Sequence, residues 1–122
     1  MDLQQVRTVC LSLPHVTEQV QWENDLVFKV GGNMFAVLML EPGEYVVSFK
    51  CSPEDYAQLV ERPGVSPAPY LARAHWVALE NFSSLPPGEL RTRLGEAHAL
   101  VFAKLPKRVQ AELNRGSGAH RS

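Results

Sequence analysis

The strongest constraint on the fold is a change in the spacing of apolar residues after Pro14. From Val16 to Lys50, apolar and polar positions largely alternate, and a period of two is typical of β-strands. The pair Gly31-Gly32 interrupts this stretch, and both glycines tolerate the positive φ angles of a two-residue hairpin loop. The segment 41–44 contains proline and glycine and predicts a second tight turn. The stretch therefore predicts an antiparallel meander of four strands with short connections.

Two further segments complete the predicted sheet region. The run Met34–Leu40 is apolar at odd and even positions alike, as expected of a central strand that is covered on both faces. His75–Leu79 predicts a fifth strand, with Val77 and Leu79 on one side. Residues 63–69 contain three prolines and a glycine, and we expect them to form an extended loop.

Helices are predicted on both sides of this region of the sequence. Apolar residues recur at intervals of three and four within Asp2–Leu13, which indicates one buried helical face. Ser52-Pro53 provides an N-cap and a favourable first helical residue. A third helix is expected between Pro86 and Pro106, and a short fourth helix over Pro106–Leu113. The predicted fold class is α+β with two layers, an antiparallel meander sheet of about five strands with helices packed on it.

The length of 122 residues is that of one ordinary domain. We expect a single domain over residues 1–113, followed by a flexible C-terminal tail over residues 114–122. Met34–Leu40 is the longest apolar run, and it is far shorter than the roughly 20 residues that span a bilayer. The N-terminus has no signal-peptide pattern. We therefore expect a cytoplasmic protein without membrane contact, in which Cys10 and Cys51 are buried and not disulfide-bonded.

The charges are distributed unevenly along the chain. Residues 1–103 contain seven lysines and arginines against twelve acidic residues, whereas residues 104–122 contain five basic residues against one acidic residue. A basic segment can bind phosphates or acidic surfaces, although it also serves solubility alone. Surfaces that bind DNA broadly are strongly basic, so any nucleic-acid site on this acidic body must be local.

No pattern in the sequence predicts catalysis, a metal or a cofactor. The four histidines lie at no metal-ligand spacing from each other, from cysteines or from acids, and phosphate-cradling and nucleophile motifs are absent. The dipeptide His75-Trp76 combines a side chain that titrates near neutral pH with a large indole ring. Two interpretations remain open for it, namely a functional site and ordinary architecture.

Several motifs occur together in a characteristic order, and the set covers about residues 1–113. They are Leu13-Pro14, Val27–Ala36, Ser48–Cys51, Pro63-Gly64-Val65, His75-Trp76 and Leu105-Pro106-Lys107. This set resembles the MmcQ/YjbR family of small bacterial proteins. The resemblance implies a fold similar to CyaY, the bacterial frataxin, and DNA binding through a double-wing arrangement. Iron binding of the frataxin kind is not implied, because the first helix contains Asp2 as its sole acidic residue.

The leading hypothesis is a non-enzymatic DNA-binding protein that contacts phosphates with low sequence specificity. The candidate DNA-binding residues are Lys29, Lys50, Arg73, Lys104, Lys107 and Arg108. The alternative is a protein-interaction or small-ligand-binding module that uses an aromatic surface near Tyr70, His75 and Trp76, beside the proline-rich loop. An enzyme with a pocket near His75 is a third hypothesis that rests on analogy. We expect a monomer or weak dimer that binds DNA or a protein partner.

Overall fold

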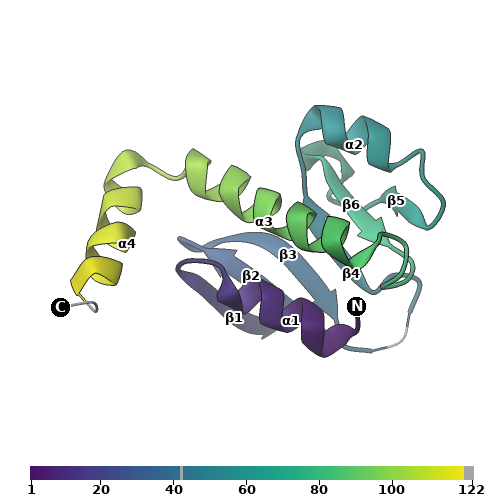
Figure 1. Ribbon diagram of the computed structural model, residues 1–122, viewed down its shortest axis with the longest axis horizontal. Coiled ribbons are helices and arrows are strands. Elements are labelled where there is room, and N and C mark those ends of the chain that lie inside the picture. Colours follow the sequence, from purple (N-terminus) through teal and green to yellow (C-terminus); the bar gives the residue numbers. More distant parts are fainter. Residues whose placement is uncertain (42, 120–122) are drawn as a thin grey trace.

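The computed structural model describes residues 1–41 and 43–119, which form four α-helices, six β-strands and one short 3₁₀-helix (Figure 1). The helices are α1 (Leu3–Ser12), α2 (Pro53–Leu59), η1 (Ala72–Ala74), α3 (Pro87–Lys104) and α4 (Lys107–Ala119). The strands are β1 (Val16–Gln21), β2 (Asp25–Val30), β3 (Asn33–Met39), β4 (Val47–Lys50), β5 (Val65–Pro67) and β6 (Trp76–Leu79). All strand pairs are antiparallel, in the order β1-β2-β3-β4-β6-β5. The predicted α+β fold is confirmed.

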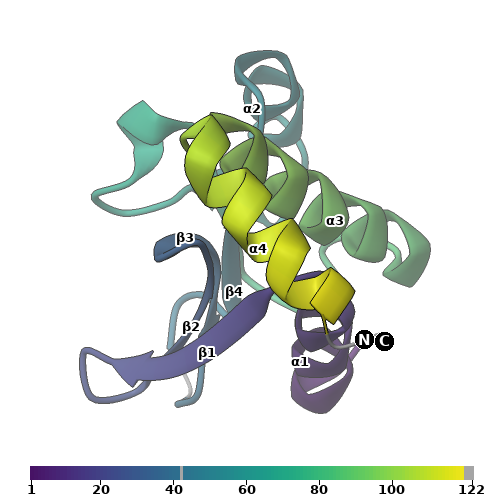
Figure 2. The same cartoon turned by 90° about the vertical axis from the view of Figure 1, so that its left-hand side faces the viewer.

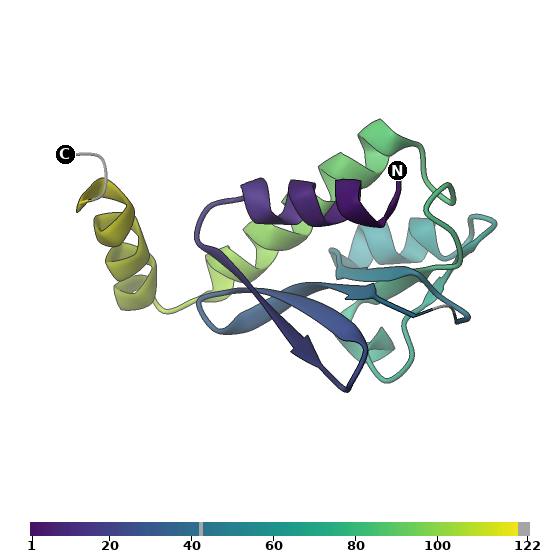
Figure 3. The ribbon, with the colours of Figure 1, turned by 90° about the horizontal axis from the view of Figure 1, so that it is seen from below.

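Helices α1 and α3 cover one face of the sheet (Figure 3). Phe28, Phe35 and Phe49 are fully buried between this face and the helices, together with Val6 of α1 and Leu94 of α3. Burial of side chains of this size stabilises a fold by about 1.5–3 kcal/mol each. The apolar faces that the helical and strand spacings predict therefore pack together in one main core.

The β2–β3 hairpin has the predicted glycine turn, with φ angles of +60° at Gly31 and +83° at Gly32. A Cβ atom on Gly31 would lie 2.5 Å from Cδ1 of Leu105. Leu105 is buried and follows the last residue of α3, which is Lys104. The absence of a side chain at Gly31 therefore lets the C-terminal end of α3 pack against the hairpin, and this contact positions Lys104.

The structure differs from the sequence predictions in three places. Val65–Pro67 within the proline-rich loop forms a sixth strand, because it pairs with β6 at the edge of the sheet, where a proline is tolerated. His75 precedes β6 because its backbone is left-handed. Helix α4 continues to Ala119, well beyond Leu113. The predicted tail therefore begins within a helix, and its residues 120–122 lie outside the described residues; the division into domain and tail stays a prediction.

The opposite face of the sheet carries a second, smaller apolar cluster. Its buried members are Val27, Val37, Ala68, Trp76 and Ala78. The loop that contains η1 packs on this face through Ala68 and Leu71, whereas α1 and α3 lie on the other side. Figure 2 shows the β1–β2 hairpin and the η1 segment projecting to the same side of the molecule, away from α1. No helix within the described part of the chain is both long and apolar enough to cross a membrane.

Candidate functional site

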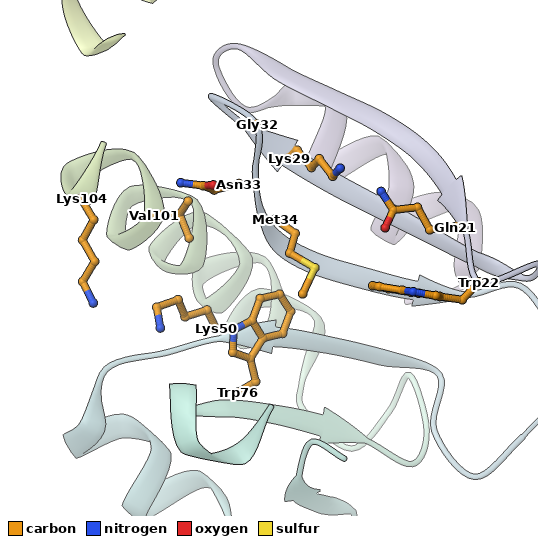
Figure 4. Close-up of a pocket in the computed structure, with 10 residues that line it drawn as sticks. All are labelled: Gln21, Trp22, Lys29, Gly32, Asn33, Met34, Lys50, Trp76, Val101 and Lys104. Atoms are coloured by element: carbon orange, nitrogen blue, oxygen red, sulfur yellow. The ribbon is translucent and has the colours of Figure 1, made fainter. Parts of the chain in front are cut away.

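A groove of about 480 Å³ lies where strands β3 and β4 separate. These strands pair from Ala36–Leu38 to Val47–Phe49, and beyond Ala36 and Phe49 they diverge (Figure 4). Val101 and Lys104, near the C-terminal end of α3, form one wall of the groove. The groove is lined by Gln21, Trp22, Lys29, Gly32, Asn33, Met34, Lys50, Trp76, Val101 and Lys104.

Three lysines from three different elements line this groove. Lys29 of β2 lies opposite Met34 of β3, and its Nζ atom donates a hydrogen bond to Oε1 of Gln19 at 3.2 Å. Lys50 of β4 lies opposite Trp76 of β6. Figure 4 shows the Lys50 side chain between the Trp76 ring and the chain of Lys104. The sheet register and the α3 terminus together place the three ammonium groups along one groove.

The charge of this groove is not compensated by neighbouring acidic side chains. Among the described residues, no aspartate or glutamate lines it. None of the three lysines forms an ion pair within residues 1–41 and 43–119, whereas Arg7, Arg62 and Arg93 all pair with carboxylates. Burial lowers the pKa of Lys50, and the positive charge of Lys104 lowers it further. Such a groove favours an anionic ligand, which would replace the missing countercharge.

The structure brings together only some of the cations predicted from the sequence. Lys29, Lys50 and Lys104 share the groove. Arg73 is exposed in η1, and Lys107 and Arg108 are exposed in the first turn of α4. These last three side chains do not line the groove. Lys104 also lies in the last turn of α3, where a positive charge favours the helix dipole, so part of its role is structural.

The three predicted aromatic residues do not form one exposed surface. Trp76 is 3% exposed and forms part of the groove wall and of the second apolar cluster. His75 is half-buried and packs its ring edge-on against Tyr56, with ring centroids 5.5 Å apart. Tyr70 is fully exposed and has a left-handed backbone. Each of the three side chains therefore has a different environment.

Sequence reasoning missed Trp22 as a site residue. Alternation along β1 places Trp22 on the same side as Val16 and Val20, which face α1. The backbone instead becomes left-handed at Trp22 and Glu23, with φ angles of +50° and +71°, and the indole turns to the groove side. Trp22 is 62% exposed. The sequence signal was a large aromatic residue directly before the polar residues Glu23 and Asn24, within the turn between β1 and β2.

A second, apolar pocket of about 530 Å³ adjoins the groove. Trp22 and Met34 line both cavities and so form their common wall. The other lining residues of the apolar pocket are Asp25, Val37, Met39, Tyr45, Ser48, Ala68, Pro69, Tyr70 and Leu71. This pocket lies between the β1–β2 hairpin and the segment before η1, on the sheet face that α1 and α3 leave uncovered.

The described residues contain no group of three His, Cys, Asp or Glu side chains that could hold a metal ion. The two cysteines are free and buried, in agreement with the prediction. Burial raises the pKa of Cys10 to about 12 and that of Cys51 to about 11. Both thiols are therefore protonated near neutral pH, and neither has the thiolate character of a nucleophile.

Comparison with known proteins places the chain in a family. The YjbR family model matches residues 11–100. The chain belongs to the YjbR family. The resemblance drawn from the sequence motifs is confirmed.

Solved structures of other proteins share the YjbR-family fold described above. A Deinococcus radiodurans protein, DR2400, which has a DUF419 domain, is 29% identical with a TM-score of 0.82, over 92% of this chain and 87% of its own. A Pseudomonas syringae protein has a TM-score of 0.67 at 21% identity, over 83% of this chain and 99% of its own, and supports the fold alone. No curated protein matches the chain.

Proposed function

We propose that this YjbR-family protein is a non-catalytic DNA-binding protein that holds phosphates in the lysine groove. The observation that carries the proposal is that Lys29, Lys50 and Lys104 all line one groove that no carboxylate lines. Phosphate groups are multivalent acceptors of charged hydrogen bonds, and lysine binds them as a point charge. Three lysines at one site therefore match consecutive backbone phosphates better than a single carboxylate ligand.

Contacts of this kind determine affinity but not sequence preference. Each neutralised phosphate releases a condensed counterion, so the logarithm of the binding constant falls with the logarithm of the salt concentration, by about 0.9 per contact on duplex DNA. For three contacts, affinity should fall by roughly 40-fold between about 50 and 200 mM salt. Lysines that contact phosphates do not read the edges of the bases, so the sequence specificity of binding should be low.

Fluorescence anisotropy of a labelled duplex at these two salt concentrations tests the proposal. Lys29→Gln, Lys50→Gln and Lys104→Gln remove the charge while largely keeping the length of the side chain, and each should weaken binding and reduce the salt slope by about 0.9. Arg91→Gln is the matched control, because Arg91 is an exposed cation on the same helix at the far end from the groove. Equal effects of Arg91→Gln and Lys104→Gln would show that binding depends on net charge and not on the groove.

A second candidate function is the binding of an apolar small ligand or protein segment, as the alternative hypothesis predicted for the region of Tyr70. The adjoining apolar pocket favours it, because its walls are formed mainly by methionine, aromatic and proline side chains. This function predicts ligand binding that changes little with salt and survives loss of the three groove lysines. The salt dependence of the measured affinity therefore separates the two candidates: affinity for DNA should fall steeply with salt, and affinity for an apolar ligand should change little.

A further inference from the structure

We propose that the strand bound in the groove is single-stranded, with one base stacked on Trp22 in the apolar pocket while the adjacent phosphates contact the lysines. The inference rests on the proposed function and names the form of nucleic acid that this site accepts. The inference assigns a role to Trp22 and to the adjoining apolar pocket. Phosphate contacts in the groove involve neither of them.

Trp22 combines an aromatic surface with ready access. Its side chain is 62% exposed, although exposure of a large indole to water is unfavourable. The ring lies along the groove beside β3 (Figure 4). An exposed ring that lines a groove is available for stacking, and stacking on an aromatic side chain stabilises single-stranded complexes irrespective of base identity.

The arrangement of the two cavities matches the chemistry of a nucleotide. The cationic groove and the apolar pocket share Trp22 and Met34 as their common wall. A nucleotide likewise joins an anionic phosphate to a flat aromatic base. The pocket volume of about 530 Å³ lies in the ordinary range for small-molecule sites and accommodates a base.

A paired duplex cannot place phosphates in the groove and a base in the apolar pocket at the same time. Its bases are stacked inside the helix, and none reaches a tryptophan unless it is unpaired. A long duplex also needs a broad basic surface, whereas residues 1–103 contain twelve acidic residues against seven basic ones. A short single strand needs only local cations beside an aromatic platform, and this is the combination that the groove provides.

The two tryptophans make the proposal directly measurable. Trp76 is 3% exposed, so a base cannot stack on it, whereas Trp22 is accessible. Titration with an oligodeoxythymidylate of about 8 nucleotides, within the range of single-stranded site sizes, should quench the Trp22 component of the fluorescence. In Trp22→Phe the remaining emission from Trp76, which lies in the groove wall but is too buried for stacking, should respond much more weakly to the oligonucleotide.

Affinity measurements compare this strand with an abasic strand of equal length and charge. Trp22→Ala should weaken binding of the oligodeoxythymidylate by roughly tenfold and leave the abasic strand within about twofold, and Trp22→Phe should keep most of the affinity. Val20→Ala is the control, because Val20 is an exposed apolar residue of β1 whose side chain faces away from the groove. Circular dichroism of each variant verifies the fold.

The outcomes distinguish this inference from the function on which it rests. If the duplex binds through the lysines, while Trp22→Ala has no effect and the single strand binds no more tightly, the single-strand inference is overturned and DNA binding stands. Equal losses for the base-bearing and abasic strands would also overturn it. If neither strand nor duplex binds at about 50 mM salt, both proposals fail.

Discussion

The ammonium group of Lys50 in β4 donates a hydrogen bond to the carbonyl oxygen of Ala74 in η1, across 2.7 Å. This bond attaches the wall of the lysine groove to the segment that leads into β6. Lys104 lines the same groove, and its positive charge lowers the pKa of Lys50 beyond the effect of burial. The hydrogen bond thus holds Lys50 in place against the repulsion of a like charge.

Removal of the charge at position 104 should raise the pKa of Lys50. Burial is the larger cause of the lowered value and persists in Lys104→Gln, so we expect a partial return toward the ordinary lysine value. Because the folded-state pKa lies below that of the unfolded chain, Lys50 makes stability rise as pH increases through the folded pKa. Titration of the lysine side-chain carbon signals by NMR measures the change, and an unaltered pKa in Lys104→Gln would contradict the coupling.

Replacement of Gly31 by alanine should destabilise the protein more than replacement of Gly32. Both positions have positive φ angles, which cost alanine about 1–2 kcal/mol. At Gly31 the new Cβ atom would also meet Leu105 at 2.5 Å, whereas at Gly32 no atom lies within 4 Å. Leu105 is buried, so its side chain would have to shift within the core to make room, and this adds to the cost at Gly31. Urea unfolding of the two variants measures this difference, and equal losses would mean that Leu105 moves aside freely.

Replacement of Gly95 by alanine should stabilise the protein by up to about 1 kcal/mol. Gly95 lies in the interior of α3, and a Cβ atom there would meet nothing within 4 Å. The gain comes from the lower conformational entropy of alanine in the unfolded chain. The reciprocal change Ala99→Gly, at an exposed position of the same helix, should cost a similar amount. A thermal melt of both variants tests the pair, and a loss of stability in Gly95→Ala would disprove the prediction.

The ion pair between Arg7 of α1 and Glu18 of β1 should contribute stability that acid removes. Nε of Arg7 donates to Oε2 of Glu18 at 2.9 Å, and Arg7 holds the pKa of the Glu18 carboxyl below its usual range. A lowered folded-state pKa means that the contribution is present above the ordinary glutamate value of about 4.3 and is lost as pH falls through the folded pKa.

Urea unfolding near pH 6 and near pH 3 tests this pH dependence. Glu18→Gln should be less stable than the original protein at the higher pH and nearly equal to it at the lower pH, with a difference that shrinks in salt. Arg7→Gln in the Glu18→Gln background should add little, because the pair is already broken. A difference that does not change with pH would assign the effect to packing instead of charge.

Features that depend on neighbouring residues were predicted from the sequence. Ser52, the predicted N-cap, accepts a hydrogen bond from the backbone N–H of Asp55 at the start of α2. The glycine hairpin and the meander β1–β4 also appear where the pattern indicated. The cap and the glycine turn depend on hydrogen bonds and φ angles within a few positions of the chain, so the local sequence contains the information.

The short strand β5 depended on its pairing with the edge of β6 and not on a pattern of its own. A loop with several prolines has no strand pattern of its own, and its residues Val65–Pro67 become a strand because β6 offers an open edge. The side on which Trp22 lies has a different, local origin. By strict alternation Trp22 would share a side with Val16 and Val20, but two consecutive left-handed residues at the hairpin turn it to the other side.

The sequence by itself determined the α+β class, the meander and the buried faces of the helices, because periodicity records which side of an element avoids water. The sequence also indicated six candidate DNA-binding cations, but it did not indicate which of them lie together. Only the tertiary structure decided that Lys29, Lys50 and Lys104 share a groove with Trp22, while Arg73, Lys107 and Arg108 lie elsewhere. The physical reason is that exposed charged side chains have no packing preference, so their grouping follows from strand register, the separation of β3 from β4 and the contact of Leu105 with Gly31.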